Sequence, residues 1–536
     1  MRKFILGVLF IAVAFVGIAQ TGYINPVIKG FNPDPSICRV GDDYYLVTSS
    51  FEYFPGLPIY HSRDLINWQQ IGHCLTRDSQ LPLHQANASD GLFAPSLRYH
   101  DGLFYVVCTN VSHGGNFYCT ATHPAGLWSE PVHVKINSID PDIFWDEDGK
   151  TYFVTQGDAI RVTEFDIKTG RLLSDERMVW GGVGARFPEA PHIYKKDGYY
   201  YLMIGEGGTE YAHSVTIARS RHIYGPYESC PSNPILTHCN HLGQGNPIQG
   251  VGHADLVQAT DGSWWAVFLG FRVTQAYSYY HILGRETFLA PVDWPKNGWP
   301  QINGNGTVDL MMDVPTLPLK PFVSKPARTE FDVDTLGFEW QYLRNPIREN
   351  YSLKEKKGQL MIKATPYTLD ETESVSFLGR RQTEHEFTAA AALAFQPKGK
   401  TDEAGLTLIQ NNTHHYDLRL RKNGNQNSIQ LRVRAGSIDY IAFEQPINSH
   451  DVELRIEGAP LYYTFYYKEA GTGNYKKLGN MDTRYLSTEV AGGFTGVMIG
   501  MYASSGGKQT GTKAWFDWFE YEIGSNLYIY GVKKSI

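Results

Sequence analysis

Three acidic residues stand in similar sequence surroundings, and their types suggest acid–base chemistry. Asp34 and Asp140 each precede a proline, and Glu189 stands in Phe-Pro-Glu-Ala-Pro. Carboxyl groups held close together resist ionising at the same time, so their pKa values are driven apart. Hydrolysis of a glycosidic bond uses one ionised carboxylate, which activates water or attacks carbon, and one protonated carboxyl group, which donates its proton to the leaving oxygen. A third acid nearby keeps the donor protonated by repulsion, so the three residues favour a glycosidase if the fold brings them together.

A repeat in the sequence supplies the elements that would position these acids. Five segments, starting at residues 34, 94, 140, 190 and 254, each contain a short strand, a turn and a second strand rich in Tyr, Phe and Val. Four of the turns are Asp-Gly, a strong hairpin signal because Gly accepts positive φ. A spacing of roughly 50 residues is that of a four-stranded blade, so the repeat predicts a five-bladed β-propeller. The first strand of each blade lines the axis, so Asp34, Asp140, Glu189 and His253 should share one mouth.

The repeat stops after its fifth copy, and a different β domain follows. The proline-rich segment 315–326 is typical of a linker. Beyond it, apolar residues alternate with polar ones in several segments, which predicts strands with one buried face and a β-sandwich; the segments are 406–409, 416–421, 429–434, 452–456 and 462–467. We therefore expect an all-β chain with a signal peptide over 1–19, a propeller catalytic domain over 20–320 and a β-sandwich domain over 326–536.

Charge and the N-terminal sequence narrow the function classes. The 536 residues carry a formal net charge of −7, which provides no basic surface for nucleic acid or for an anionic membrane. Arg2 and Lys3 precede an apolar run over 4–19 that ends in small residues, which is the pattern of a secretory signal peptide. We expect an exported protein, periplasmic or secreted, that is soluble after the signal peptide is removed.

The six cysteines match no zinc-binding spacing. Cys38 and Cys108 lie in apolar strand patterns and are expected to be buried thiols. Because export permits disulfides, a bond between Cys230 and Cys239 that closes a loop is the alternative for that pair.

Nearly the whole chain after the signal peptide resembles glycoside hydrolase family 43. The three acidic motifs carry the resemblance, and further segments extend it, including the second domain, which resembles the family's jelly-roll, concanavalin-like sandwich. These segments begin at Phe51 (FEYFPG), Gly205 (GEGGT), Gly252 (GHA), Leu283 (LGRET), Arg380 (RRQ) and Ala404 (AGLTLIQNN). Relatives commonly have Glu-Gly-Pro where this chain has Glu189-Ala-Pro. The added methyl group near the acid is expected to be tolerated, and it would narrow the pocket.

The resemblance implies a role for each acid. Asp34 would be the general base that activates water, Glu189 the general acid, and Asp140 the residue that tunes the pKa of Glu189 and orients it. The family inverts anomeric configuration, which implies roughly 6.5–9.5 Å between the acid and base carboxyl groups. Asp142 competes with Asp140 for the third role; Asp140 is preferred because it occupies the same repeat position as Asp34.

The resemblance also implies residues that bind the terminal sugar. His253, Arg285 and Thr209 would line the pocket, and Phe51 and Phe93, where relatives often carry Trp at the second position, would form its apolar walls. No cofactor is required for the chemistry. A structural calcium ion near the propeller axis is the alternative role for His253, as in some relatives, and the metal is left open.

Taken together, these features predict an exo-acting, inverting enzyme that acts on oligosaccharides. It would release non-reducing-end α-L-arabinofuranosyl residues from hemicellulose fragments such as arabinoxylan or xyloglucan, because Phe93 and Ala190 depart from the common xylosidase pattern. A β-D-xylosidase or a dual-specificity enzyme is the alternative.

Retaining fructan- and sucrose-cleaving enzymes share the fold but typically carry Arg-Asp-Pro and Glu-Cys-Pro motifs. A non-catalytic sugar-binding propeller would not need three converging acids. The oligomeric state is left open.

Overall fold

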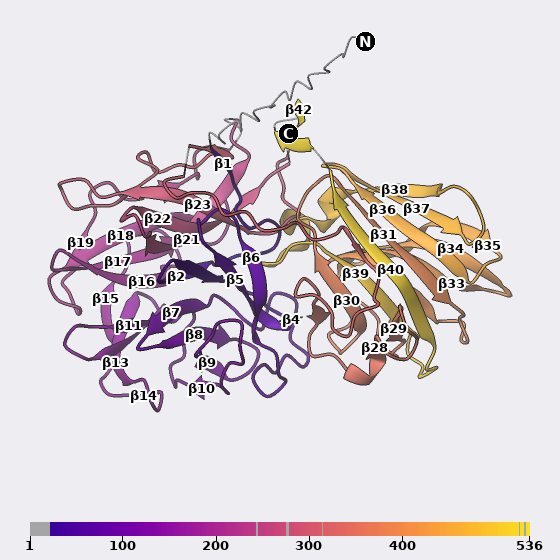
Figure 1. Cartoon of the computed structure of the whole chain (residues 1–536), viewed down its shortest axis with the longest axis horizontal. Helices are drawn as coiled ribbons and strands as arrows, with labels where there is room; N and C mark the ends of the chain where they lie inside the picture. Colours follow the sequence, from indigo (N-terminus) through magenta and orange to yellow (C-terminus); the bar gives the residue numbers. More distant parts are fainter. Residues whose placement is uncertain are drawn as a thin grey trace, which may run out of the picture.

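The computed structural model describes residues 22–524 apart from 243–244, 275–277 and 314, together with the backbone of two short C-terminal strands, β41 (Asn526–Ile529) and β42 (Val532–Ser535). The expected signal peptide, residues 1–19, lies outside this part. In Figure 1 the indigo-to-magenta half of the chain forms one β domain and the orange-to-yellow half forms a second beside it. No helix in the described residues is long and apolar enough to cross a membrane.

Five successive antiparallel sheets make up the first domain. The first two contain β2 (Ser36–Val40), β3 (Asp43–Val47), β5 (Gly56–Ser62) and β6 (Gln69–Leu75), then β7 (Ser96–His100), β8 (Leu103–Asn110), β9 (Gly115–Ala121) and β10 (Val132–His133). The third contains β11 (Asp142–Trp145), β12 (Thr151–Thr155), β13 (Ile160–Asp166), β14 (Arg171–Leu172) and β15 (Arg177–Trp180). The fourth contains β16 (Glu189–Lys196), β17 (Tyr199–Glu206), β18 (Ser214–Ser220), β19 (Glu228–Ser229) and β20 (Leu236–Thr237). The fifth contains β21 (Ile248–Gln258), β22 (Trp264–Arg272), β23 (Glu286–Asp293) and β24 (Gln301–Ile302).

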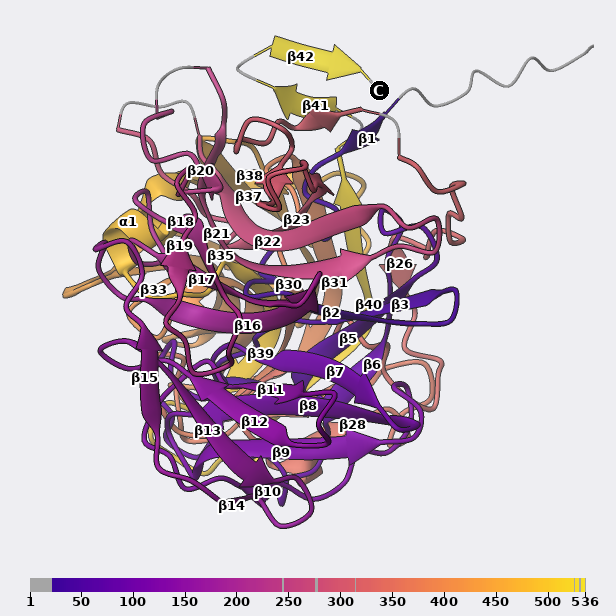
Figure 2. The ribbon, with the colours of Figure 1, turned by 90° about the vertical axis from the view of Figure 1, so that its left-hand side faces the viewer.

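These sheets form a closed ring, as expected for propeller blades. Their first strands contact one another in order, β2 with β7, β7 with β11, β11 with β16 and β16 with β21, and β21 returns to β2. Figure 2 shows the blades from the side of this domain. The N-terminal β1 (Tyr23–Ile24) pairs with β25 (Met311–Met312), and an isolated bridge joins Ile28 to Thr287 of the last blade. The five-bladed propeller predicted from the repeat is therefore confirmed.

Asp-Gly turns explain why the second and fourth repeats form tight hairpins. In the second repeat Asp101 and Gly102 have φ of 47° and 81°, and in the fourth Asp197 and Gly198 have φ of 51° and 73°. Positive φ at both central residues is the signature of a type I′ turn, whose twist matches that of the flanking strands. The sequence thus fixes the register of the two inner strands locally.

Two packed sheets make up the second domain, which confirms the predicted β-sandwich. One sheet has the order β28 (Tyr351–Ser352), β29 (Leu360–Lys363), β40 (Lys513–Ile523), β31 (Phe387–Phe395), β36 (Asp451–Gly458), β37 (Tyr462–Glu469) and β38 (Lys476–Asp482), with β26 (Arg328–Thr329) beside β40. The other has the order β30 (Ser376–Arg381), β39 (Met498–Ser504), β32 (Glu403–Asn411), β33 (His414–Asn423), β34 (Gln426–Ala435) and β35 (Ile438–Ile447). Three short helical turns, η1 (Arg348–Asn350), η2 (Thr483–Leu486) and α1 (Thr488–Ala491), lie between strands.

The apolar alternation in the sequence places the sandwich core. Leu418 and Leu420 of β33 are fully buried against the facing sheet, in one cluster with Leu454 of β36 and Phe465 of β37. Burial of such side chains contributes about 1.5–3 kcal/mol each and holds the two sheets together.

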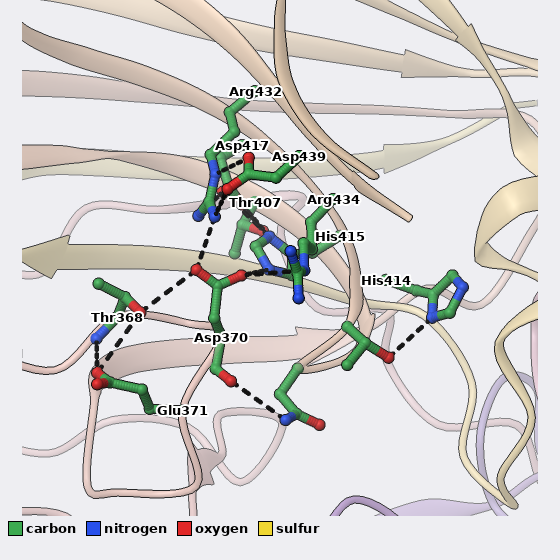
Figure 3. Close-up of polar contacts among 12 residues, drawn as sticks. Thr368, Asp370, Glu371, Thr407, His414, His415, Asp417, Arg432, Arg434 and Asp439 are labelled. Carbon is green, nitrogen blue, oxygen red and sulfur yellow. Dashed lines mark hydrogen bonds and ion pairs between the residues drawn. The ribbon is translucent and has the colours of Figure 1, made fainter. Parts of the chain in front are cut away.

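The opposite face of β32, β33 and β34 carries buried polar residues that neutralise one another. Asp370, in the loop before β30, accepts hydrogen bonds from His415 (3.1 Å) and Arg432 (2.6 Å), and His415 also contacts Asp417 at 2.9 Å (Figure 3). Burial alone would lower the pKa of His415, but Asp417 and Asp370 outweigh it and raise that pKa to about 9. His415 is therefore a buried cation that ties this loop to the sheet.

Contacts between the two domains are polar as well as apolar. The strand β4 (Tyr53–Phe54) of the propeller pairs with β27 (Tyr342–Leu343), and Glu384 of the sandwich forms ion pairs with both Lys29 (2.6 Å) and Arg272 (2.8 Å). The sandwich is thus attached to the same side of the propeller as the loop that follows β3.

All six cysteines lie in the described part of the chain and are free. Cys38 and Cys108 are buried, as expected. The alternative of a Cys230–Cys239 disulfide is wrong for this structure, since Cys230 is buried in the fourth blade and Cys239 is exposed.

Candidate active site

A pocket of about 110 Å³ lies at one mouth of the propeller axis. All eight residues that the sequence singled out line it, and three more do so as well. The lining comprises Asp34, Phe51, Phe93, Ala94, Ile139, Asp140, Glu189, Thr209, His253, Arg285 and Phe494. The structure therefore brings the predicted residues to one place, while the role of each in catalysis stays a prediction.

An unusual backbone conformation aims several of these side chains. Asp34, Asp140, Ala190 and His253 have φ of 55°, 51°, 53° and 50°, and each lies at or next to the start of a repeat. Left-handed φ is uncommon outside Gly and Asn, and such strain persists where the surrounding structure holds it, often at functional sites. In four of the five blades the chain therefore bends sharply in or just before the first strand, and the bend presents a side chain to the mouth.

Asp34 is the acid whose surroundings favour the ionised form. Its carboxylate accepts hydrogen bonds from Arg285 Nη1 (2.9 Å) and from the Ser49 hydroxyl, and His253 Nδ1 lies 3.7 Å from its Oδ1. Burial alone would raise the pKa of Asp34, but the positive charge of Arg285, the nearby His253 and the Ser49 hydrogen bond bring it below its ordinary value. Asp34 is consequently ionised at neutral pH.

The pKa values of Asp140 and Glu189 are shifted in the opposite direction, upward. Burial first, and then the negative charge of Asp34, raise the pKa of Asp140 to about 7, although the Ala190 backbone N–H donates to it at 3.2 Å. Burial and the charges of Asp140 and Asp34 raise the pKa of Glu189 well above its ordinary value. His213 lies 3.6 Å from Glu189, but burial lowers its own pKa to about 3, so it supplies no positive charge. The pocket thus holds one ionised acid beside a pair that retains a proton.

Arg285 joins the charged and apolar parts of the pocket. Besides Asp34, its guanidinium donates to the Thr209 hydroxyl (2.8 Å) and to the backbone carbonyl of Phe494 (3.3 Å). The same group lies 5.6 Å from the ring centroid of Phe51 and 5.4 Å from that of Phe494. Arg285 therefore orients the Asp34 carboxylate and fixes two of the walls.

Ala94, Ile139 and Phe494 line the pocket without having been predicted, and of these Phe494 contributes an aromatic wall. It belongs to the second domain and packs against both predicted aromatic walls, with ring centroids 5.9 Å from Phe51 and 6.0 Å from Phe93. Its backbone N–H donates to the Ser89 hydroxyl at 2.8 Å, and the Ser89 N–H in turn donates to the buried Glu52 carboxylate at 3.0 Å. No motif around position 494 marks it, because its place depends on how the domains dock.

Asp142, the competitor for the third acidic role, points away from the pocket. It accepts from Arg98 Nη2 at 2.7 Å and lies 2.9 Å from His192 Nδ1, deeper along the axis. Arg98 also donates to Asp255 at 2.8 Å, so its guanidinium occupies the axis between the two carboxylates. This arrangement supports the choice of Asp140.

The side chains near the axis can be compared with what a bound metal ion, such as calcium, would require. Among the described residues no three His, Cys, Asp or Glu side chains are grouped so that they could hold one. Asp255, two residues after His253, already accepts hydrogen bonds from Ser36, Tyr194 and Arg98. No group of three such side chains in the described residues therefore supports the calcium alternative, and Arg98 supplies positive charge beside Asp142 and Asp255.

Comparison with known proteins agrees with both domains. Residues 23–300 match the model of glycosyl hydrolases family 43, and residues 328–522 match that of the beta xylosidase C-terminal concanavalin A-like domain. The chain is 46% identical over 517 residues to the non-reducing end alpha-L-arabinofuranosidase BoGH43B of Bacteroides ovatus, covering 95% of this chain and 96% of that protein. It is 40% identical to a xylosidase/arabinosidase of Butyrivibrio fibrisolvens, covering 93% and 99%.

A solved structure shows the same architecture. The Bacteroides ovatus xyloglucan PUL GH43B superposes with a TM-score of 0.90 at 45% sequence identity, covering 94% of this chain and all of that one. Both the propeller with its three acids and the sandwich that adds Phe494 are thus accounted for by one family over nearly the full length. The chain belongs to glycosyl hydrolases family 43.

Proposed function

We propose that this glycoside hydrolase removes single α-L-arabinofuranosyl residues from the non-reducing ends of hemicellulose oligosaccharides, with inversion of configuration. The observation that carries the proposal is the opposite shift of the pKa values in one pocket. Asp34 is held ionised by Arg285, while Glu189 is held protonated by burial and by the neighbouring acids. This is the division of labour that glycoside hydrolysis requires.

Each acid then has one task. The Asp34 carboxylate accepts a proton from a water molecule as that water attacks the anomeric carbon. The Glu189 carboxyl group donates its proton to the glycosidic oxygen as the bond to the leaving group breaks. Asp140 does not touch the reacting atoms in this scheme; it adds negative charge and accepts from the Ala190 N–H next to Glu189, which keeps the acid protonated and in place.

The shape of the pocket favours exo action. It is small, and Phe494 of the sandwich closes one side of it against Phe51 and Phe93. A polysaccharide chain cannot continue past a closed end, so the bound sugar is a terminal one. Arg285 and Thr209 present hydrogen-bond donors and acceptors to its hydroxyl groups.

The choice of sugar rests on the relatives. A relative that covers this chain almost completely is named as a non-reducing end α-L-arabinofuranosidase, and a solved relative is named for xyloglucan. A second relative is named xylosidase/arabinosidase, which favours β-D-xylosidase or dual activity as the alternative. Export to the periplasm or medium, proposed from the N-terminal sequence, would bring the enzyme to such fragments.

A substrate screen tests the proposal. The enzyme and its Asp34→Asn variant are incubated with p-nitrophenyl α-L-arabinofuranoside, p-nitrophenyl β-D-xyloside and arabinosylated xyloglucan or arabinoxylan oligosaccharides. We expect the arabinofuranoside to be the better aryl substrate, arabinose to be the released sugar, and the variant to be inactive on all. Faster cleavage of the xyloside would favour the alternative, and longer fragments among the early products would exclude exo action.

A further inference from the structure

An exposed aromatic ring stands beside the proposed acid, outside the pocket that holds the terminal sugar. Phe187 lies two residues before Glu189, and its side chain is 56% exposed. Its φ of 54° is in the left-handed region, which is an outlier for a bulky residue. A large apolar side chain held exposed in a strained conformation is a feature that the surrounding structure must maintain.

The loop that carries Phe187 is fixed from below by a buried carboxylate. Glu206 at the end of β17 is fully buried and accepts hydrogen bonds from the backbone N–H groups of Val183 (3.0 Å) and Ala185 (3.2 Å), and from the Thr216 hydroxyl. Two loop residues, Val183 and Ala185, therefore share one anchor in the blade. The loop over residues 183–187 therefore forms a firmly anchored rim of the mouth.

Further contacts fix the ring itself. The guanidinium carbon of Arg186 lies 5.5 Å from the ring centroid of Phe187, and Arg186 forms an ion pair with Glu210 and donates to the Gly207 carbonyl at 2.9 Å. The ring also lies against Gly208, where an added Cβ would come within 3.2 Å of it. Gly208 precedes Thr209, which lines the pocket, so the ring stands at the edge of that pocket.

We propose that Phe187 is the platform on which the leaving-group sugar stacks. This inference rests on the proposed function and concerns the part of the substrate on the leaving-group side of the cleaved bond. The acid must reach the glycosidic oxygen, so the sugar beyond that oxygen extends past Glu189 onto the rim. A sugar ring presents a face of C–H groups that packs on a phenyl ring, and Arg186 and Glu210 beside it provide partners for hydroxyl groups.

The test compares two leaving groups. An arabinosylated oligosaccharide has a sugar as leaving group and would contact Phe187, whereas α-L-arabinofuranosyl fluoride has a single atom and would not. For Phe187→Ala we expect kcat/KM on the oligosaccharide to fall about tenfold, because the sugar would cover about half of the phenyl ring and the variant loses the hydrophobic contact made there. On the fluoride we expect kcat/KM to change less than twofold. Phe187→Tyr keeps the ring and should keep the rate on both.

Controls separate the platform from the fold and from the pocket. Val183→Ala removes another exposed apolar side chain, 49% exposed, from the same loop and should leave both rates unchanged. Phe494→Ala changes the pocket wall and should lower both. Equal effects of Phe187→Ala on the two substrates, or no effect on either, would overturn the inference. If wild-type enzyme releases fluoride from neither arabinofuranosyl nor xylosyl fluoride, the proposed function fails and this inference fails with it.

Discussion

Replacement of Arg285 by Gln should move the acidic limb of the pH–rate profile to higher pH. Arg285 Nη1 lies 2.9 Å from Asp34 Oδ1, and its charge is the main reason that the pKa of Asp34 lies below its ordinary value of 3.8 despite burial. A general base works only when it is ionised, so activity is lost as the pH falls through its pKa. Without the cation, the pKa of Asp34 rises and this loss begins at higher pH.

The size of this pKa shift follows from the distance between Arg285 and Asp34. Charge centres about 4 Å apart interact by about 4 kcal/mol at an effective dielectric constant near 20, which corresponds to about 3 pKa units. His253 and the Ser49 hydroxyl remain in the variant, and water enters the space that the guanidinium leaves. We therefore expect a shift of about 1–3 units in the acidic limb. Arg285 also lowers the pKa values of Asp140 and Glu189, so the alkaline limb should move to higher pH as well.

The assay is kcat/KM on an aryl arabinofuranoside between pH 3 and 9, with thermal unfolding measured at each pH to confirm that the variant is folded. Arg186→Gln is the matched control, because Arg186 lies at the same mouth but pairs with Glu210 and does not contact Asp34. If Arg285→Gln lowers the rate equally at every pH and leaves the acidic limb in place, Arg285 does not control the pKa of Asp34.

Three further predictions concern the acid, the residue that tunes it and the buried histidine of the sandwich. Glu189→Ala should lower hydrolysis of natural oligosaccharides about 10²–10⁴-fold more than that of an aryl substrate with a very acidic leaving group, and equal losses would mean that Glu189 is not the acid. Asp140→Asn should move the alkaline limb to lower pH with a reduced maximum, because a charge that raises the pKa of Glu189 is removed, whereas Asp142→Asn should leave that limb in place; the reverse result would exchange their roles. Since the folded-state pKa of His415 is about 9, above its ordinary 6.5, its stabilisation of the sandwich is complete below pH 6.5 and is lost as the pH rises through 9, an effect of about 3 kcal/mol. Thermal melts between pH 6 and 10 should show this loss, and His415→Gln should have a lower and flatter profile.

The sequence predicted those features that repeat or that depend on neighbours along the chain. Hairpins with Asp-Gly turns fix their own register. Five copies of one four-stranded unit are typical of a ring of propeller blades, so the shared position of Asp34 and Asp140 at the axis could be inferred. The alternation of apolar residues predicted the strands of the sandwich for the same reason.

Features that depend on contacts distant in sequence could not be predicted in this way. Phe494 reaches the pocket only because the sandwich docks beside β4, and its local sequence carries no sign of it. The pairing of Arg98 with Asp142 and Asp255 across the axis depends on three different blades. The rim held by Glu206 is a further case, since the motif that contains this residue predicted a binding role for Thr209 and none for the loop before Glu189.

The stereochemistry of the first product tests the central claim most directly. If Asp34 activates water on the face opposite the leaving group, proton NMR in the first minutes of hydrolysis of an aryl α-L-arabinofuranoside should show the β anomer of arabinose before mutarotation. The α anomer as the first product, or a sugar trapped covalently on the enzyme, would contradict the assignment of Asp34 as base and Glu189 as acid.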